Sequence, residues 1–151
     1  MAQDPQLQTN AQDNLDMEFA SGVAAFESKQ FSRAMQLLHP FAEQGDAHAQ
    51  HMVAIMYQNG LGVAQSDVAA WKWMKDAADQ GYGLAQHGLG FMYLEGECVD
   101  KDAATAANWF NKAAEQGLAG SQLALALMYE EGNGVPQDLE KAQRLYKLAG
   151  Y

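Results

Sequence analysis

Residues 85–117, with the sequence AQHGLGFMYLEGECVDKDAATAANWFNKAAEQG, decide the fold because their pattern recurs on both sides at a spacing of 36 residues. The recurrence covers many columns of the pattern. Four sets keep this spacing: Gln50, Gln86 and Gln122; Tyr57, Tyr93 and Tyr129; Gly60, Gly96 and Gly132; and Ala70, Ala106 and Ala142. A period of about 20–50 residues indicates stacked supersecondary units. The sequence therefore predicts a repeat protein.

Each repeat is predicted to form a pair of helices. In the repeat at 46–81, Ala49, Val53 and Tyr57 follow a helical spacing. Gly60 is predicted to end this helix, because glycine adopts the left-handed conformation without strain. A second helix follows in every repeat, and its predicted N-caps are Ser66, Asp102 and Asp138.

The first unit is shorter than the others. Gly22 and Ala34 lie 12 residues apart, whereas the equivalent Ala54 and Ala70 lie 16 apart, so we expect a hairpin with a shorter loop. Residues 1–14 are polar and lack an apolar period, which predicts a disordered lead-in. The prediction is one all-α domain over 15–151, with repeats at about 15–45, 46–81, 82–117 and 118–151.

The pattern resembles the Sel1-like repeat family, a subclass of tetratricopeptide-type α/α repeats with a longer loop between the helices. The resemblance covers about residues 15–151 and rests on Ala-Gln in the first helix, Gly-x-Gly-Val in the loop and Ala-Ala-x-Gln-Gly at the end of the second helix. The first hairpin is similar to an ordinary tetratricopeptide repeat, and Cys98 replaces one loop glycine.

This resemblance implies a right-handed α/α superhelix, a solenoid of four helical hairpins whose first helices line a concave face. It also implies a non-enzymatic adaptor or scaffold that binds peptides or proteins. Such proteins are often bacterial and often exported.

The composition limits the function classes. The 151 residues are 48% hydrophobic and 19% charged, which predicts a folded domain. Nine basic residues against nineteen acidic ones give a net charge of −10, which excludes nucleic-acid binding through a basic surface. No apolar run approaches the roughly 20 residues that span a bilayer, so direct membrane insertion is not expected. Cys98 is the only cysteine, which excludes an intrachain disulfide.

A candidate groove follows from the register of the first helices. The residues expected on the concave face are Phe19, Val23, Phe26, His48, His51, Ile55, Gln58, Leu84, His87, Phe91, Leu94, Leu123, Leu127 and Glu130. Ile55, Phe91 and Leu127 share one column and are apolar, although packing within the hairpin does not require it. An exposed apolar strip marks a partner site. The alternative is that a tightly wound superhelix packs these residues between neighbouring first helices.

No metal, cofactor or catalytic site is expected. The sequence has no Gly-x-Ser-x-Gly elbow, phosphate loop or His-Glu-x-x-His motif. His48 and His51 lie near a predicted helix start, and His51 and His87 are repeat-equivalent. Packed helices lie about 10 Å apart, whereas each imidazole on a zinc ion lies about 2.0–2.1 Å from the metal. The acidic neighbours of Cys98 predict an inert thiol with a raised pKa.

Two function classes follow. The preferred one is a protein–protein interaction module that holds an apolar or basic partner, since an acidic field attracts basic surfaces. The alternative is a cell-wall-associated enzyme or inhibitor that acts on a small ligand. That function needs a polar cluster with perturbed pKa values, for which the candidates are His48, His51 and Glu130.

Location and assembly are also expectations at this stage. The polar lead-in and the resemblance favour a periplasmic or secreted protein after removal of a signal peptide, with a cytoplasmic protein as the alternative. The apolar residues of the last repeat favour end-to-end association of copies, and they include Met128, Leu145, Tyr146 and Tyr151.

Overall fold

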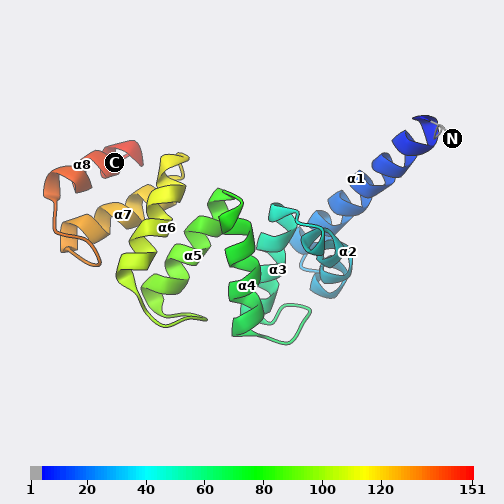
Figure 1. Cartoon of the computed structure of the whole chain (residues 1–151), viewed down its shortest axis with the longest axis horizontal. Helices are drawn as coiled ribbons and strands as arrows, with labels where there is room; N and C mark the ends of the chain where they lie inside the picture. Colours follow the sequence, from blue (N-terminus) through cyan, green and yellow to red (C-terminus); the bar gives the residue numbers. More distant parts are fainter. Residues whose placement is uncertain (1–4) are drawn as a thin grey trace.

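The computed structural model describes residues 5–151, and this part of the chain is all-α. Its eight helices are α1 (Pro5–Glu27), α2 (Phe31–Glu43), α3 (Ala47–Asn59), α4 (Asp67–Asp79), α5 (Gly83–Glu95), α6 (Ala103–Glu115), α7 (Ala119–Glu131) and α8 (Leu139–Leu148). They pair as four helical hairpins, which follow one another along the chain (Figure 1). The predicted all-α solenoid of four helical hairpins is therefore confirmed. Within residues 5–151, no helix is long and apolar enough to cross a membrane.

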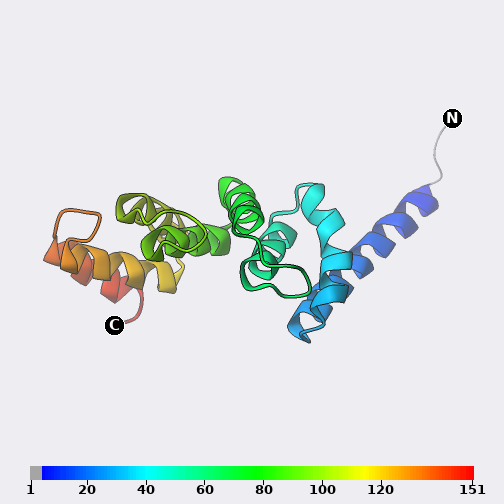
Figure 2. The ribbon, with the colours of Figure 1, turned by 90° about the horizontal axis from the view of Figure 1, so that it is seen from below.

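The hairpins form a row along the long axis of the molecule (Figure 2). The two helices of each hairpin pack on each other, and the second helix of one hairpin packs on the first helix of the next. Most contacts therefore join elements that are neighbours in sequence, as in other solenoids. The first helices are α1, α3, α5 and α7, and the second helices are α2, α4, α6 and α8.

The structure differs from the expected disordered lead-in. Helix α1 begins at Pro5, so residues 5–14 are helical, while the rest of the predicted lead-in lies outside the described residues. Proline is favourable at the start of a helix, and no further proline or glycine interrupts the chain until Gly22. The N-terminal part of α1 projects away from the other helices (Figure 1).

The helix ends have the predicted caps. Gly60, Gly96 and Gly132 end α3, α5 and α7 in the left-handed conformation, with φ of 64°, 70° and 67°. Ser66 and Asp102 begin α4 and α6, where their side chains accept hydrogen bonds from the backbone N–H groups three residues later. Asp138 does the same at α8.

Small residues in the first helices make room for large ones in the second helices. Phe110 is fully buried, and a Cβ atom on Gly90 would lie only 2.7 Å from Phe110 Cε1. Trp73 and Trp109, in contrast, are half-buried at the junctions between hairpins. Lys72 covers the Trp73 ring at 3.8 Å from its centroid, and Lys112 covers the Trp109 ring at 4.5 Å.

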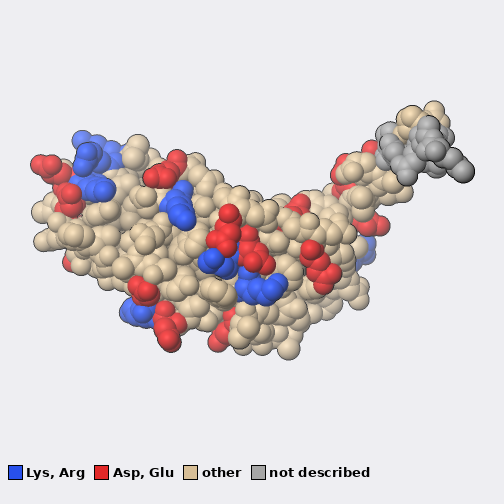
Figure 3. All heavy atoms as spheres, viewed as in Figure 1, with Lys and Arg blue, Asp and Glu red and all other residues tan. Residues whose placement is uncertain are grey.

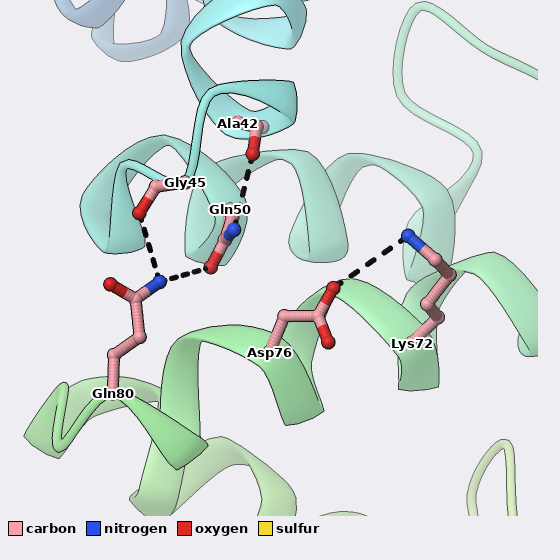
Figure 4. Close-up of polar contacts among 6 residues, drawn as sticks. All are labelled: Ala42, Gly45, Gln50, Lys72, Asp76 and Gln80. Carbon is pink, nitrogen blue, oxygen red and sulfur yellow. Dashed lines mark hydrogen bonds and ion pairs between the residues drawn. The ribbon is translucent and has the colours of Figure 1, made fainter.

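Buried glutamines tie each first helix to the hairpin before it. Gln50 Nε2 donates to the carbonyl oxygen of Ala42 at 3.1 Å. Gln80 Nε2 donates both to Gln50 Oε1 at 2.8 Å and to the carbonyl oxygen of Gly45 at 2.9 Å (Figure 4). We call this arrangement the glutamine clamp. It recurs one repeat later, with Gln86, Gln116, Ala78 and Gly81 in the same roles.

Candidate functional site

All the predicted groove residues belong to α1, α3, α5 and α7, which we call the first-helix layer; α2, α4, α6 and α8 form the second-helix layer. The surface of the first-helix layer that carries the predicted groove residues is called the first-helix face. None of them is fully buried. Leu84, Phe91 and Leu127 are among the exposed large hydrophobic residues. The two arrangements considered above, an open groove and packing between helices, occur in different parts of this face.

At the N-terminal part of the face, aromatic packing fills the space between helices. The ring of His48 lies 5.5 Å from that of Phe19 on α1 and 5.8 Å from that of Tyr82 (centroid to centroid). His51 lies 5.5 Å from the same tyrosine. Tyr82 is the N-cap residue of α5 and was not among the predicted site residues. The equivalent residue one repeat later, Leu118, is also large and apolar, and this recurrence was the signal in the sequence. This part of the face is packed.

Burial lowers the pKa of His51 to about 4, and the neighbouring His48 and His87 add to the shift. Burial also lowers the pKa of His87. Both imidazoles are therefore neutral at pH 7, and neither supplies a positive charge to the face.

The middle of the face is built on Phe110 from the second-helix layer. The Phe91 ring lies 5.0 Å from the Phe110 ring and 4.9 Å from the His87 ring, both in edge-to-face geometry. His87 Nδ1 and Ser121 Oγ share a hydrogen bond of 2.6 Å, which joins α5 to α7. Gly120 permits this approach, since a Cβ atom there would lie 3.2 Å from His87 Cε1. Phe91 therefore packs against two rings, and one of them, His87, is itself held by Ser121.

Beside Phe91 the face opens into a pocket of about 260 Å³ between α5 and α7, which we call the α5–α7 pocket. Its lining is mostly apolar, and two of its walls are exposed side chains: Phe91 is 36% exposed and Leu127 is 43% exposed. Four of the predicted groove residues contribute to it. The lining residues are Phe91, Leu94, Gly120, Leu123, Ala124, Leu127, Met128, Glu131 and Asn133.

The candidates for a catalytic cluster are not brought together. His48 and His51 lie on α3 against Tyr82, whereas Glu130 lies on α7, beyond α5. Glu130 Oε2 instead accepts a hydrogen bond of 2.5 Å from the Tyr146 hydroxyl, which raises the pKa of Tyr146 to about 12. Within residues 5–151, no three His, Cys, Asp or Glu side chains form a group that could hold a metal ion.

A second, wider cleft lies at the loop between α5 and α6. Gly62 and Gly134 let the equivalent loops touch the start of the preceding second helix, where a Cβ atom would lie 2.4 Å and 2.5 Å from backbone carbons. Cys98 has the same left-handed conformation, with φ of 66°, but its Cβ atom prevents that approach. A cleft of about 990 Å³ lies at this loop, and Asp67 and Trp71 line one side of it.

The thiol of Cys98 is hydrogen-bonded in this cleft. Cys98 Sγ lies 3.4 Å from Asp67 Oδ1, to which it donates a hydrogen bond. Burial, this hydrogen bond and the charge of Asp67 together raise the pKa of Cys98 to about 12, and Glu97 adds to the shift. Cys98 is therefore protonated at pH 7, and the thiol is a much weaker nucleophile than the thiolate.

Comparison with known proteins gives a consistent result. The model of the Sel1 repeat matches residues 24–46, 47–82, 83–118 and 119–151. The last three matches each begin one residue later than the repeats predicted from the sequence. The comparison with curated proteins found no match.

Solved structures with similar folds include two that share about a third of the sequence. A Sel1 repeat protein from Oxalobacter formigenes is 30% identical with a TM-score of 0.82, over 87% of this chain and 54% of that one. A protective antigen of uropathogenic Escherichia coli strains, with an SLR fold, is 34% identical with a TM-score of 0.85, over 99% of this chain and 33% of that one. The chain thus spans about half the length of the Oxalobacter protein and about a third of the length of the Escherichia coli antigen. Helicobacter pylori cysteine rich protein B, 19% identical with a TM-score of 0.63 over 80% of this chain and 86% of that one, shares the fold.

Proposed function

The chain belongs to the Sel1 repeat family, as the sequence resemblance predicted, and we propose from this premise that it is a non-enzymatic module that binds a protein or peptide partner through its first-helix face. Sel1 repeat proteins generally mediate protein–protein interactions, and the family is typically non-enzymatic. The observation that carries the proposal for this face is the α5–α7 pocket, with its exposed Phe91 and Leu127.

The size of the pocket favours a side chain of a partner over a free small molecule. Pockets for small ligands usually measure about 300–1,000 Å³ and enclose most of the ligand. The α5–α7 pocket measures about 260 Å³ and is open along the face. Its apolar lining suits one large apolar side chain, while the rest of a partner chain lies across α5 and α7. The proposed partner segment is therefore anchored at Phe91 and Leu127.

No observation favours the enzyme or inhibitor alternative. It needs His48, His51 and Glu130 to act on one ligand, but α5 separates the two histidines from the glutamate. The lowered pKa of His51 comes mainly from burial beside aromatic rings and not from a polar cluster. The interaction module therefore remains the proposal.

The experiment is a selection of random 12-residue peptides displayed on phage against the immobilised protein, followed by binding of the enriched peptides to variants. Burying a leucine fully is worth about 1.5–3 kcal/mol, and 43% of Leu127 is exposed. Its burial by a partner is thus worth about 0.6–1.3 kcal/mol, so Leu127→Ser should weaken binding about 3- to 10-fold. Phe91→Ser should have an effect of similar size.

The matched control is Leu139→Ser, because Leu139 is a 59% exposed leucine on α8, in the other layer. Its binding should equal that of the wild type, and circular dichroism should show that all variants remain folded. If the enriched peptides bind Leu127→Ser as tightly as Leu139→Ser, the pocket is not their binding site and this proposal is wrong.

A further inference from the structure

We propose that the partner segment is basic as well as apolar: it inserts one large apolar side chain into the α5–α7 pocket and places lysine or arginine beside the carboxylates of the first helices. This inference rests on the proposed function and adds the charge of the partner to it. It is carried by the distribution of charge between the two layers of the solenoid.

The first-helix layer contains no lysine or arginine. All nine basic residues of the chain lie in second helices or in loops. Figure 3 shows basic side chains gathered over α4 and α8. Several are engaged within their own layer: Lys72 and Lys75 pair with Asp76 and Asp79, at 3.6 and 2.7 Å between nitrogen and oxygen. His51 on α3 does not replace them, because burial lowers its pKa to about 4 and keeps it neutral at pH 7.

The same layer carries carboxylates at equivalent positions. The last residues of α1, α3, α5 and α7 form one column of the repeat, and they are Glu27, Asn59, Glu95 and Glu131. The three glutamates are exposed, and none of them is in an ion pair among the described residues. Three acidic side chains therefore line the edge at which all four first helices end.

The helix ends themselves add to this negative potential. A helix C-terminus carries a partial negative charge, which basic residues in the last turn usually offset. No basic residue occupies the last turn of any first helix. A cation beside the last turn of α5 or α7 therefore meets a carboxylate at the negative end of a helix dipole.

The pocket and the acidic edge meet at Glu131. This residue lines the α5–α7 pocket and is its only charged lining residue. Glu95 is its equivalent on α5, the other wall of the pocket. An apolar side chain in the pocket thus places its neighbouring residues beside Glu131, and a segment that continues across α5 reaches the helix end that carries Glu95. Neither glutamate is in an ion pair among the described residues. Charge complementarity selects lysine or arginine at those neighbouring positions and disfavours acidic ones.

The test uses peptides enriched from the random 12-residue library whose binding depends on Leu127. We expect these peptides to carry lysine or arginine within about four positions of a large apolar residue. An exposed ion pair changes affinity about 1.4- to 5-fold, so the double variant Glu95→Gln/Glu131→Gln should weaken binding about 2- to 25-fold. The loss should shrink in 1 M salt, where the Debye length falls from about 8 to about 3 Å.

The control is Glu140→Gln, which removes one negative charge from α8 and should leave affinity unchanged, while each single variant, Glu95→Gln or Glu131→Gln, should weaken binding. Leu127-dependent peptides that lack basic residues, or that bind the double variant as tightly as the wild type, would overturn this inference while the proposed function stands. A selection that yields no Leu127-dependent peptide would overturn both.

Discussion

Replacing Gln86 by methionine should lower the free energy of unfolding by about 2 kcal/mol, and the same replacement at Gln122 should lower it by about half as much. Methionine is similar to glutamine in length and flexibility, so the exchange removes the amide without opening a large cavity. Gln86 donates to the Ala78 carbonyl oxygen at 3.3 Å and accepts from Gln116 at 2.8 Å. Among the described residues, the side chain of Gln122 forms only one such bond, to the Ala114 carbonyl oxygen at 3.2 Å.

The magnitude follows from the number of bonds lost. A hydrogen bond contributes about 0.5–1.5 kcal/mol net. No further penalty is added, because the partners of Gln86 keep other bonds: the Ala78 carbonyl accepts from Gly81 N at 3.0 Å, and Gln116 still donates to the Gly81 carbonyl at 2.9 Å. Two lost bonds correspond to about 1–3 kcal/mol, and one lost bond to about 0.5–1.5 kcal/mol.

The assay is equilibrium unfolding in urea followed by far-ultraviolet circular dichroism. The midpoints should fall while the slope of free energy against urea stays constant, which shows that a change in stability is being measured. In thermal unfolding, each kcal/mol corresponds to about 2–4 °C for a chain of this size. Gln50→Met is the matched control, since Gln50 also makes two such bonds. If Gln86→Met destabilises the protein no more than Gln122→Met does, the bond count does not set the stability and the reasoning is refuted.

Three further outcomes are expected. Gly90→Ala should cost about 1–3 kcal/mol in thermal unfolding, because its Cβ atom would lie 2.7 Å from Phe110 Cε1, and adding Phe110→Leu should recover part of the loss. Lowering the pH from 6.5 to 4 should remove up to about 3 kcal/mol of stability through His51, because the unfolded chain binds a proton at this residue that the folded chain excludes. In urea titrations, the stability of His51→Phe should depend less on pH over this range than that of the wild type. An unchanged pH dependence would contradict the lowered pKa of His51. Iodoacetamide should alkylate Cys98 far more slowly in the folded protein than in urea at pH 8, because the pKa of its thiol is raised to about 12 in the folded protein. Equal rates would contradict a partly buried, hydrogen-bonded thiol.

The helix ends, and the starts of the last three repeats to within one residue, could be predicted from the sequence, because they depend on local chemistry. A left-handed cap such as Gly60 or an N-cap such as Asp102 is recognisable in isolation. The 36-residue period then fixes the hairpins, since each copy repeats the same signals. Helix α1 is the exception: its polar residues 5–14 lack an apolar face, and the pattern says nothing of a helix that continues beyond the packed part.

The candidate site could be predicted only in part, because it depends on which side chains meet across repeats. Leu94 and Leu127 follow from helical register, and both line the pocket. The difference between the two ends of the face does not follow from register. Tyr82 fills the space beside His48 and His51, whereas Gly120 leaves space beside His87. The absence of basic residues from the first helices was visible in the sequence, once the helices were assigned to layers.

The glutamine clamp has a consequence for how such a chain changes over evolutionary time. Each clamp joins a repeat to the one before it through the same atoms, so the loss of residues 82–117 would present the Ala78 carbonyl oxygen to Gln122 in place of that of Ala114. Duplication of a 36-residue repeat would likewise create a new contact between two hairpins, with the same glutamine hydrogen bonds that already join other hairpins of the chain. Recombination between repeats thus yields shorter or longer proteins without the need for new packing solutions. The length of the array, and the number of helix pairs that can host a pocket, can drift while the fold persists.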